Sequence, residues 1–334
     1  MKLAFSAMIS PQQIFSIHSE EDFTDAALEV FTYQSKHCRV YSDYINMIGM
    51  DAVKIKSLYE IPFLPVEFFK THEVLSDEKK QEIIFESSGT TGTTNSRHFV
   101  ADKEIYTESF TRCFKMFYGS ISDYCILALL PSYLERKNSS LVFMAEYLIK
   151  NSKNSQSGFY LSEFNELFDT LTSLNKAGKK NILLGVSYAL MDFAEQFPAE
   201  LPRTIIMETG GMKGRRKEMT KEELHTALGK AFRKDTIHAE YGMTELLSQA
   251  YSQGNGIFQC PPWMKILLRN PDDPFDVFGN RQSGNINIID LANIYSCGFI
   301  ATQDVGKTSG KGFEVLGRTD SSDLRGCNLL VSEM

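Results

Sequence analysis

The stretch SSGTTGTT, which runs from Ser87 to Thr94, is the part of the sequence around which the rest can be interpreted. It follows the apolar residues Ile83 to Phe85, a pattern that predicts a buried strand. Its two glycines let the main chain bend sharply and turn N–H groups towards an anion, while its hydroxyls add uncharged donors. It lacks the spacing and the closing lysine of a Walker A loop. Alone, the stretch fits a phosphate-cradling loop and a polar surface turn equally well.

The composition is that of an ordinary globular protein with enough apolar material for a sizeable core. Of the 334 residues, 43% are hydrophobic and 23% are charged. The formal net charge of −7 gives no indication of a surface for nucleic acid or anionic membranes. The start of the chain is a poor signal peptide, and the longest strongly apolar run, Cys125 to Leu130, is too short to span a membrane. We therefore expect a cytoplasmic protein without a membrane span.

The cysteines are scattered and show no C-x-x-C spacing. This pattern argues against a zinc site and against a disulfide framework, and it favours a reducing compartment. The six residues are Cys38, Cys113, Cys125, Cys260, Cys297 and Cys327.

Apolar strands alternate with helices through the middle of the chain. Strands are predicted at 124–130, 181–186, 204–208 and 236–241, with helices at 102–117, 140–149, 163–174, from 188 onwards and at 218–228. This alternation predicts an α/β fold, with a mainly parallel sheet that has helices on both faces. In such sheets ligands bind at the carboxyl ends of the strands, where we expect the glycine-rich loop and the motifs described below.

The two ends of the chain have a different character. Helices are expected near 22–30 and 41–48, whereas 61–70 contains two prolines and should be an extended apolar segment in the core. After Leu246, short apolar pieces at 264–268, 286–289, 299–302 and 313–316 predict a small antiparallel β region. We expect one large domain over 1–320, with an α/β part at 1–245 and a β-rich part at 246–320. A short tail, 321–334, follows it.

The pentapeptide YGMTE, Tyr241 to Glu245, follows a predicted strand and combines groups that suit a nucleotide. The Tyr241 ring can stack on a base and the Thr244 hydroxyl can reach a phosphate. The Glu245 carboxylate can hold Mg²⁺. We expect Thr244 and Glu245 to act in catalysis.

Together with the glycine-rich loop, this pentapeptide resembles the motif pair of the adenylate-forming superfamily, which includes acyl-CoA synthetases, luciferases and peptide-synthetase adenylation domains. Three further pieces follow the superfamily pattern: TGG at 209–211, TQD at 302–304 and GRTD at 317–320. The resemblance implies that Gly210 and Gly211 lie against adenine, and that Asp304 and Arg318 reach the ribose. It also implies that Asp320 is a hinge between two domains.

The resemblance implies ATP and Mg²⁺ as cofactors, with Glu245 as the metal ligand. The implied ATP-binding residues are Ser87, Ser88, Gly89, Thr90, Thr91, Gly92, Arg97, Gly210, Gly211, Tyr241, Asp304 and Arg318. Two departures stand out. No Pro-Lys follows the loop, so Arg97 is expected to supply the positive charge, and Gln303 occupies the place of the glycine in the T-G-D motif.

Along nearly its whole length the chain resembles the LuxE-type acyl-protein synthetases of bacterial bioluminescence. The resemblance is carried by PFLPVEFFK at 62–70, the glycine-rich loop, YGMTE, and the ending RTD at 318–320 with RGC at 325–327. It implies that a fatty acid is activated with ATP, transferred to a cysteine near the C-terminus and passed to a partner reductase. Only 321–334 follow the hinge, so the superfamily's C-terminal domain with its catalytic lysine is expected to be absent.

Cys327 lies where the acylated cysteine of that family would be, and Arg325 could stabilise its thiolate. A small buried residue is the alternative interpretation of Cys327, and Cys297 is a weaker rival as nucleophile.

Two other functions stay open from the sequence alone. The acyl group could go to coenzyme A or to an acyl-carrier protein, or the chain could be a non-catalytic adenylate-binding scaffold. The basic stretch 213–217 fits a solvated turn better than a docking site for an acidic carrier protein. His98 could orient a phosphate or lie on the surface, and His238 is expected to pack in a buried strand.

Overall fold

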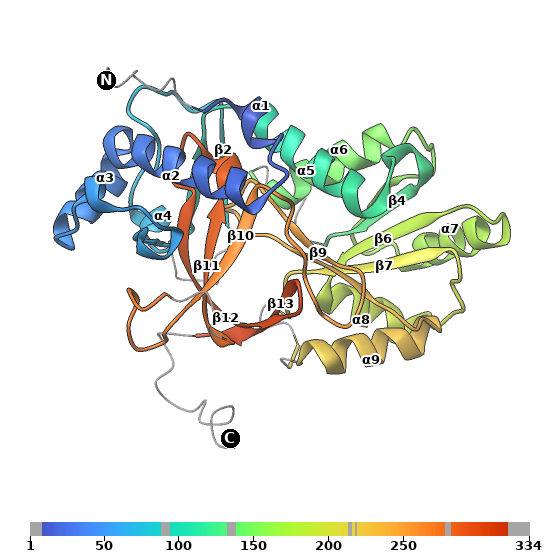
Figure 1. Ribbon diagram of the computed structural model, residues 1–334. Coiled ribbons are helices and arrows are strands. Elements are labelled where there is room, and N and C mark those ends of the chain that lie inside the picture. Colours follow the sequence, from blue (N-terminus) through green and yellow to red (C-terminus); the bar gives the residue numbers. More distant parts are fainter. Residues whose placement is uncertain are drawn as a thin grey trace.

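The protein is built around two β-sheets that lie side by side, with helices around them (Figure 1). A computed structural model describes residues 9–87, 94–131, 138–212, 216–217, 219–277 and 282–319. Within these residues no helix is both long and apolar enough to cross a membrane.

The first sheet has six strands in the order β5-β4-β6-β7-β8-β9. They are β4 (Cys125–Leu129), β5 (Gly158–Tyr160), β6 (Asn181–Val186), β7 (Thr204–Thr209), β8 (His238–Tyr241) and β9 (Ala250–Ser252). Neighbouring strands are parallel except for the β8–β9 pair. Every residue of β4 and β6 is buried, as expected for central strands covered on both faces.

The helices that precede β4 or connect the strands from β4 to β8 cover both faces of the first sheet. They are α5 (Lys103–Tyr118), α6 (Ser140–Asn151), α7 (Phe164–Lys176), α8 (Ser187–Gln196) and α9 (Lys221–Phe232). In Figure 1, α5 and α6 lie on one side of the sheet and α8 and α9 on the other. The predicted α/β fold with mainly parallel strands is confirmed, and the helix and strand bounds agree with the predicted ones to within a few residues.

The second sheet is antiparallel apart from one strand added from the N-terminal part. Its strands are β1 (Leu64–Pro65), β10 (Met264–Arg269), β11 (Ser283–Asp290), β12 (Phe299–Ser309) and β13 (Gly312–Arg318). The predicted antiparallel β region is therefore present, and β1 pairs with β12 in parallel. Since β9 belongs to the first sheet and β1 to the second, both sheets take strands from either side of residue 245. The division at 245 and 320 stays a prediction.

The N-terminal helices pack against this second sheet. They are α1 (Pro11–Ile14), α2 (Glu20–His37), α3 (Arg39–Met47) and α4 (Phe68–Thr71), and short 3₁₀ turns lie at η1 (Ala52–Lys54), η2 (Leu58–Glu60), η3 (Ile121–Asp123) and η4 (Leu291–Asn293). Ser19 and Asp22 form the capping box that begins α2. Gln34 of α2 accepts a hydrogen bond from the main chain of Gly298 at 3.0 Å and is itself fully buried, which ties this helix to the sheet.

The proline-containing segment 61–70 is extended only in part. It is buried at Phe63, Leu64 and Val66, as expected for a core segment. After the second proline the chain turns into α4, because a proline restricts its own backbone and that of its predecessor but not the residues that follow.

The strand before the glycine-rich loop was predicted to belong to the parallel sheet. This prediction is wrong, because the strand lies in a separate two-stranded sheet. Instead β2 (Ile83–Glu86) pairs with β3 (Arg97–Val100) in an antiparallel hairpin, and of its apolar residues only Phe85 is buried. Reciprocal bonds close the base of the loop: Ser87 N–H donates to Ser96 O at 3.0 Å, and Ser96 N–H donates to Ser87 Oγ at 2.8 Å. Ser88, Gly89, Thr90, Thr91 and Gly92 lie outside the described residues.

Candidate nucleotide-binding site

The two glycine-containing motifs that follow β7 and β8 lie at the same edge of the first sheet. These strands are parallel neighbours, with Thr209 opposite Glu240, so their carboxyl ends meet. Gly210, which follows β7, has φ +68°, a left-handed conformation that favours glycine. The tertiary structure therefore places Gly210 and Gly211 beside the YGMTE motif, as expected for two walls of one ligand site.

Tyr241, Asp304 and Arg318 form a cluster although 63 residues separate the first two. The Tyr241 hydroxyl donates to Asp304 Oδ2 at 2.7 Å, and Arg318 Nε lies 3.5 Å from Asp304 Oδ1. Antiparallel pairing of β12 with β13 places Asp304 directly opposite Arg318. Three residues taken from three different motifs thus lie together at one point.

The environment of Tyr241 keeps its hydroxyl protonated. Burial, followed by the negative charge of Asp304, raises its pKa well above the ordinary value. The ring packs against Phe258 and Phe313, with centroids 5.8 and 5.6 Å apart. Because two aromatic neighbours fix the ring and Asp304 fixes the hydroxyl, Tyr241 presents a rigid surface on which a base can stack.

Glu245 is a buried carboxylate, 4% exposed, beside the base of the glycine-rich loop. Burial raises its pKa, while a hydrogen bond from the Ser96 side chain and the positive charges of Arg318 and Lys70 oppose this rise. Ser96 closes the loop with Ser87, so Glu245 connects the loop to the YGMTE motif. Thr244, its predecessor, is partly exposed.

His98 is fully buried, which excludes the surface position, one of the two alternatives that the sequence left open. Its Nδ1 lies 2.9 Å from Thr244 O, and its ring packs edge-on against Phe69 with centroids 5.6 Å apart. It therefore contacts the YGMTE motif through the main chain. His238 is half-buried in β8, where its Nδ1 lies 3.2 Å from the hydroxyl of Tyr118.

The glutamine in the TQD motif has a specific partner. The Gln303 amide donates to Glu67, and the main-chain N–H and hydroxyl of Thr319 both donate to Gln303 O at 2.8 Å. These bonds fix the main chain next to Asp304. The departure from T-G-D is thus accommodated by Glu67, which lies in the proline-containing segment.

Sequence reasoning missed Ser96, Glu67 and Lys70 as neighbours of the site. Glu67 and Lys70 lie in the PFLPVEFFK stretch, which was attributed to the core because most of its residues are apolar. The signal that could have identified them is that these two charged side chains interrupt the apolar run at 62–70.

Arg97, the expected substitute for the missing lysine, is exposed at the start of β3. Its guanidinium lies 5.5 Å from the centroid of the Phe99 ring. Its role at the phosphates stays a prediction, as does the binding of ATP by the other candidates. Cys327, Arg325, Asp320 and residues 213–215 of the basic stretch lie outside the described residues.

Comparison with known proteins decides the family. The model of the LuxE acyl-protein synthetase family matches residues 9–334, which is nearly the whole chain. This chain belongs to the LuxE family. The resemblance on which the motifs were interpreted is confirmed, and the family is one of ligase-type enzymes. Among curated protein sequences, none matches this member of the family.

Solved structures similar to this LuxE-family chain show the same fold at low identity. One is 2-hydroxyisobutyryl-CoA ligase in the postadenylation state with 2-HIB-AMP, with TM-score 0.65, 11% identity, and coverage of 95% of this chain and 73% of that chain. Another is McyG A-PCP with phenylalanyl-adenylate, with TM-score 0.52 and 13% identity. The match covers 92% of this chain and 60% of that chain. A third is the acyl acid amido synthetase AtGH3.15 with 2,4-DB, with TM-score 0.53 and 11% identity. The match covers 96% of this chain and 72% of that chain. The chain has the fold of adenylate-forming enzymes.

The five described cysteines of this LuxE-family chain are poor nucleophiles. Burial raises the pKa of each thiol: to about 11 for Cys38, to about 12 for Cys260, and well above the ordinary value for Cys113 and Cys297, with a smaller rise for Cys125. Cys297 is fully buried, and its thiol donates to Phe299 O at 3.4 Å. A thiol in such a place is protonated and inaccessible, so Cys297 fits poorly as an acyl acceptor.

Next to the YGMTE motif lies the buried carboxyl group of Glu240, whose pKa is close to neutral pH. Burial, followed by the negative charge of Glu208, raises the pKa of Glu240 to about 7, although a hydrogen bond from Thr209 and the charge of Lys221 oppose this. A Cβ at position 242 would overlap Glu240 Oε1. A side chain at position 242 would therefore displace the Glu240 carboxyl group.

The titration of Glu240 should appear in the pH dependence of stability. Its pKa is about 7 in the folded state against an ordinary value of 4.5, so the folded state retains a proton that the unfolded state loses in this range. The free energy of unfolding should therefore fall by about 3 kcal/mol as pH rises from 4.5 to 7. Glu240→Gln, which has no charge to bury, should be more stable than the wild type at pH 8 and lose this advantage at pH 4.5.

Denaturant unfolding at several pH values measures this difference. The same replacement at the exposed Glu222 is a matched control, for which we expect no difference between pH 4.5 and pH 8. A Glu240→Gln difference that is constant with pH would show that folding does not shift the pKa of Glu240.

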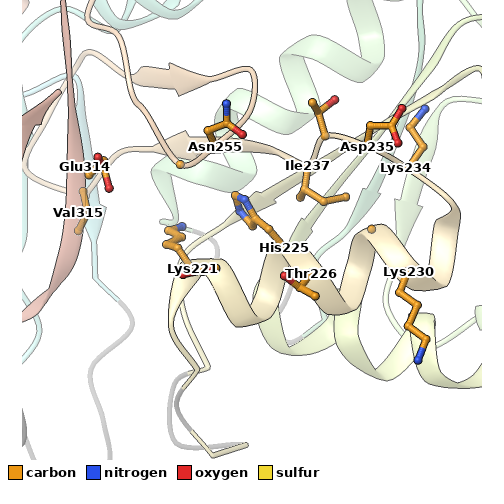
Figure 2. A pocket seen from close by; sticks show the side chains of 14 residues that line it. Lys221, His225, Thr226, Lys230, Lys234, Asp235, Ile237, Asn255, Glu314 and Val315 are labelled. Carbon is orange, nitrogen blue, oxygen red and sulfur yellow. The ribbon is translucent and has the colours of Figure 1, made fainter. Parts of the chain in front are cut away.

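A cavity of about 490 Å³ lies beside α9. It is bordered by β13 and the loop at Asn255 (Figure 2). Lys221, Lys230 and Lys234 contribute positive charge, while the cavity also contains carboxylates. Both Lys221 and His225 bind Glu208, the latter at 3.3 Å. None of the predicted ATP-binding residues that the structure describes lines this cavity, and its mixture of charges does not select one class of ligand.

The described residues fit Mg²⁺ only if the ion arrives with a phosphate substrate. They contain no group of three or more His, Cys, Asp or Glu side chains that could hold a metal alone. Glu245 supplies one buried carboxylate, and Mg²⁺ in nucleotide sites is commonly bound by one or two carboxylates together with substrate phosphates. This donor set is compatible with a metal–nucleotide complex, and the role of Glu245 as a metal ligand stays a prediction.

Proposed function

We propose that this protein is an ATP-dependent acyl-protein synthetase that activates a fatty acid as acyl-AMP. The acyl group then passes to the thiol of Cys327 and from there to a partner protein such as a reductase. The family supports the acyl-protein synthetase activity. The choice of a long-chain acid, the role of Cys327 and the reductase partner are parts of this proposal.

The single observation that carries the proposal is the cluster of Tyr241, Asp304 and Arg318 next to the YGMTE motif. A phenol and a carboxylate are held together at 2.7 Å, with a guanidinium 3.5 Å from the same carboxylate. Such a cluster offers an aromatic face for adenine together with acceptors and donors for ribose hydroxyls. A structural role alone gives no reason for these residue types to come from three separate motifs.

In the first step, an oxygen of the fatty-acid carboxylate attacks the α-phosphorus of ATP. The bond from that phosphorus to the oxygen bridging to the β-phosphate breaks, and pyrophosphate leaves. Tyr241, Asp304 and Arg318 hold the nucleoside, and the Thr244 hydroxyl and the glycine-rich loop orient the phosphates. Bound Mg²⁺, held through Glu245, would neutralise phosphate charge. Positioning and electrostatic stabilisation accelerate such a transfer more than acid–base catalysis does.

In the second step, the thiolate of Cys327 attacks the carbonyl carbon of acyl-AMP. A carbon–sulfur bond forms, the carbon–oxygen bond to phosphate breaks, and AMP leaves as an anion. The thiol proton passes to solvent when the thiolate forms, and Arg325 would stabilise that thiolate. The raised pKa of each of the five described cysteines favours Cys327 as the nucleophile, because a protonated thiol reacts poorly.

Exchange of labelled pyrophosphate into ATP, measured with a panel of fatty acids, tests the first step. We expect exchange that depends on both acid and Mg²⁺. No exchange with any acid would favour the non-catalytic scaffold.

The second step is tested with a labelled fatty acid. Labelling of the protein that requires ATP, and that hydroxylamine removes, supports the thioester. Acylation of added coenzyme A or carrier protein without protein labelling would favour the alternative ligase.

A further inference from the structure

His98 holds the main chain of the YGMTE motif from the side of β3. The acceptor 2.9 Å from its Nδ1 is the carbonyl oxygen of Thr244, so Nδ1 must carry the hydrogen. The ring is fully buried and is packed edge-on against Phe69. Burial lowers the pKa of His98 to about 4, so the imidazole is neutral at physiological pH and Nε2 carries no hydrogen. The side chain of Asn293 lies close to this ring and, together with the bond to Thr244, opposes the lowering of the pKa.

Asn293, the last residue of η4, holds the same main chain at the next residue. Its side-chain Nδ2 donates to Glu245 O at 2.8 Å, and the residue is fully buried. Its own carbonyl accepts from the side chain of Gln34 at 2.7 Å, which anchors η4 to α2. The two carbonyls of Thr244 and Glu245 are therefore bound by side chains that come from widely separated parts of the chain.

The residues after the motif are fixed in the same way. Asp290, also fully buried, accepts the main-chain N–H groups of Leu247 at 2.8 Å and Ser248 at 2.9 Å. Main-chain polar groups at four of the five positions from Thr244 to Ser248 thus have buried side-chain partners. Because side chains from other elements bind these main-chain groups, they fix the backbone from which the Thr244 and Glu245 side chains project.

We propose that His98 and Asn293 are positioning residues for the adenylation step. They hold the carbonyls of Thr244 and Glu245 so that the hydroxyl of one and the carboxylate of the other face the nucleotide phosphates. This inference rests on the proposed function, to which it adds two residues that do not contact the substrate. Reactions that depend on orientation lose rate when the reacting groups shift by about 1 Å, which can lower the rate on the order of 10²-fold.

The test compares two replacements of His98. His98→Leu keeps apolar bulk but removes the donor, whereas the side-chain amide of His98→Asn can place an N–H near the position of Nδ1. For pyrophosphate exchange at saturating ATP and fatty acid, we expect His98→Leu to be slower by about 10- to 100-fold. His98→Asn should recover most of the rate. The Mg²⁺ concentration for half-maximal exchange should rise in His98→Leu, because Glu245 is then less well oriented.

His238→Leu is the matched control, since His238 is a half-buried histidine that bonds Tyr118 instead of the motif. It should lower the thermal unfolding midpoint but keep the exchange rate within about twofold, the size expected when no catalytic group is displaced. If folded His98→Leu exchanges at the wild-type rate, or if His98→Asn is as slow as His98→Leu, the inference is wrong.

Asn293→Asp is an independent test should His98→Leu fail to fold. It keeps the shape of the side chain but replaces the donor facing Glu245 O with an acceptor. We expect slower exchange and a higher Mg²⁺ requirement, and an unchanged rate in the folded variant would overturn the inference. Absence of exchange in the wild type would overturn the proposed function itself, whereas an active wild type with unaffected variants would overturn the positioning role alone.

Discussion

Cys327→Ser is expected to form acyl-AMP at the wild-type rate and to carry no hydroxylamine-labile acyl group. The reason lies in the other cysteines. Burial raises the pKa of all five thiols that the structure describes, including Cys297, so none of them can replace a missing nucleophile at neutral pH. The loss of thioester should therefore be complete rather than partial, while pyrophosphate exchange, which precedes acyl transfer, should be unaffected.

Two measurements on the same samples check this result. Pyrophosphate exchange reports adenylation, and labelled fatty acid retained on the protein before and after hydroxylamine reports the thioester. Cys260→Ser is the matched control because Cys260 is the one described cysteine that is partly exposed, and it should retain full labelling. Label at Cys297, or none on the wild type while coenzyme A is acylated efficiently, would remove Cys327 from the mechanism.

Glu245→Gln is expected to slow the first half-reaction by about 10²-fold or more. A carboxylate that holds a metal–phosphate complex in a site with little water contributes a few kcal/mol to the transition state, about the effect of removing one preorganised contact. The amide keeps the volume of the side chain and can still accept a hydrogen bond from Ser96. The loss should therefore come from the missing charge and not from a collapse of the loop base.

Pyrophosphate exchange over a range of Mg²⁺ concentrations measures this effect, and thermal unfolding establishes that the variant is folded. We expect the variant to require more Mg²⁺ for half-maximal exchange. The same replacement at Glu146, which is exposed on α6, is the control and should be neutral. If folded Glu245→Gln exchanged pyrophosphate at the wild-type rate, the assignment of Glu245 to the metal would have to be abandoned.

The mainly parallel sheet could be predicted because its signals are local. The central strands β4 and β6 are short, continuous apolar runs, and polar motifs end β7 and β8. Such features depend on a few neighbouring residues, so a single sequence contains them completely. For β2, three apolar residues indicated a strand but could not distinguish a hairpin from a parallel strand, because the partner β3 shows no clear alternation of its own.

The sequence by itself determined where the motifs lie along the chain, but it did not determine which of them are in contact. Tyr241 contacts Asp304 only because β8 ends beside β12, and Asp304 contacts Arg318 only because β12 and β13 pair in that register. In the same way the sequence left His98 between a phosphate ligand and a surface residue, and only the tertiary structure buried it against Thr244. Contacts between residues far apart in the chain depend on sheet register and helix packing, which hydrophobic periodicity and turn chemistry do not encode.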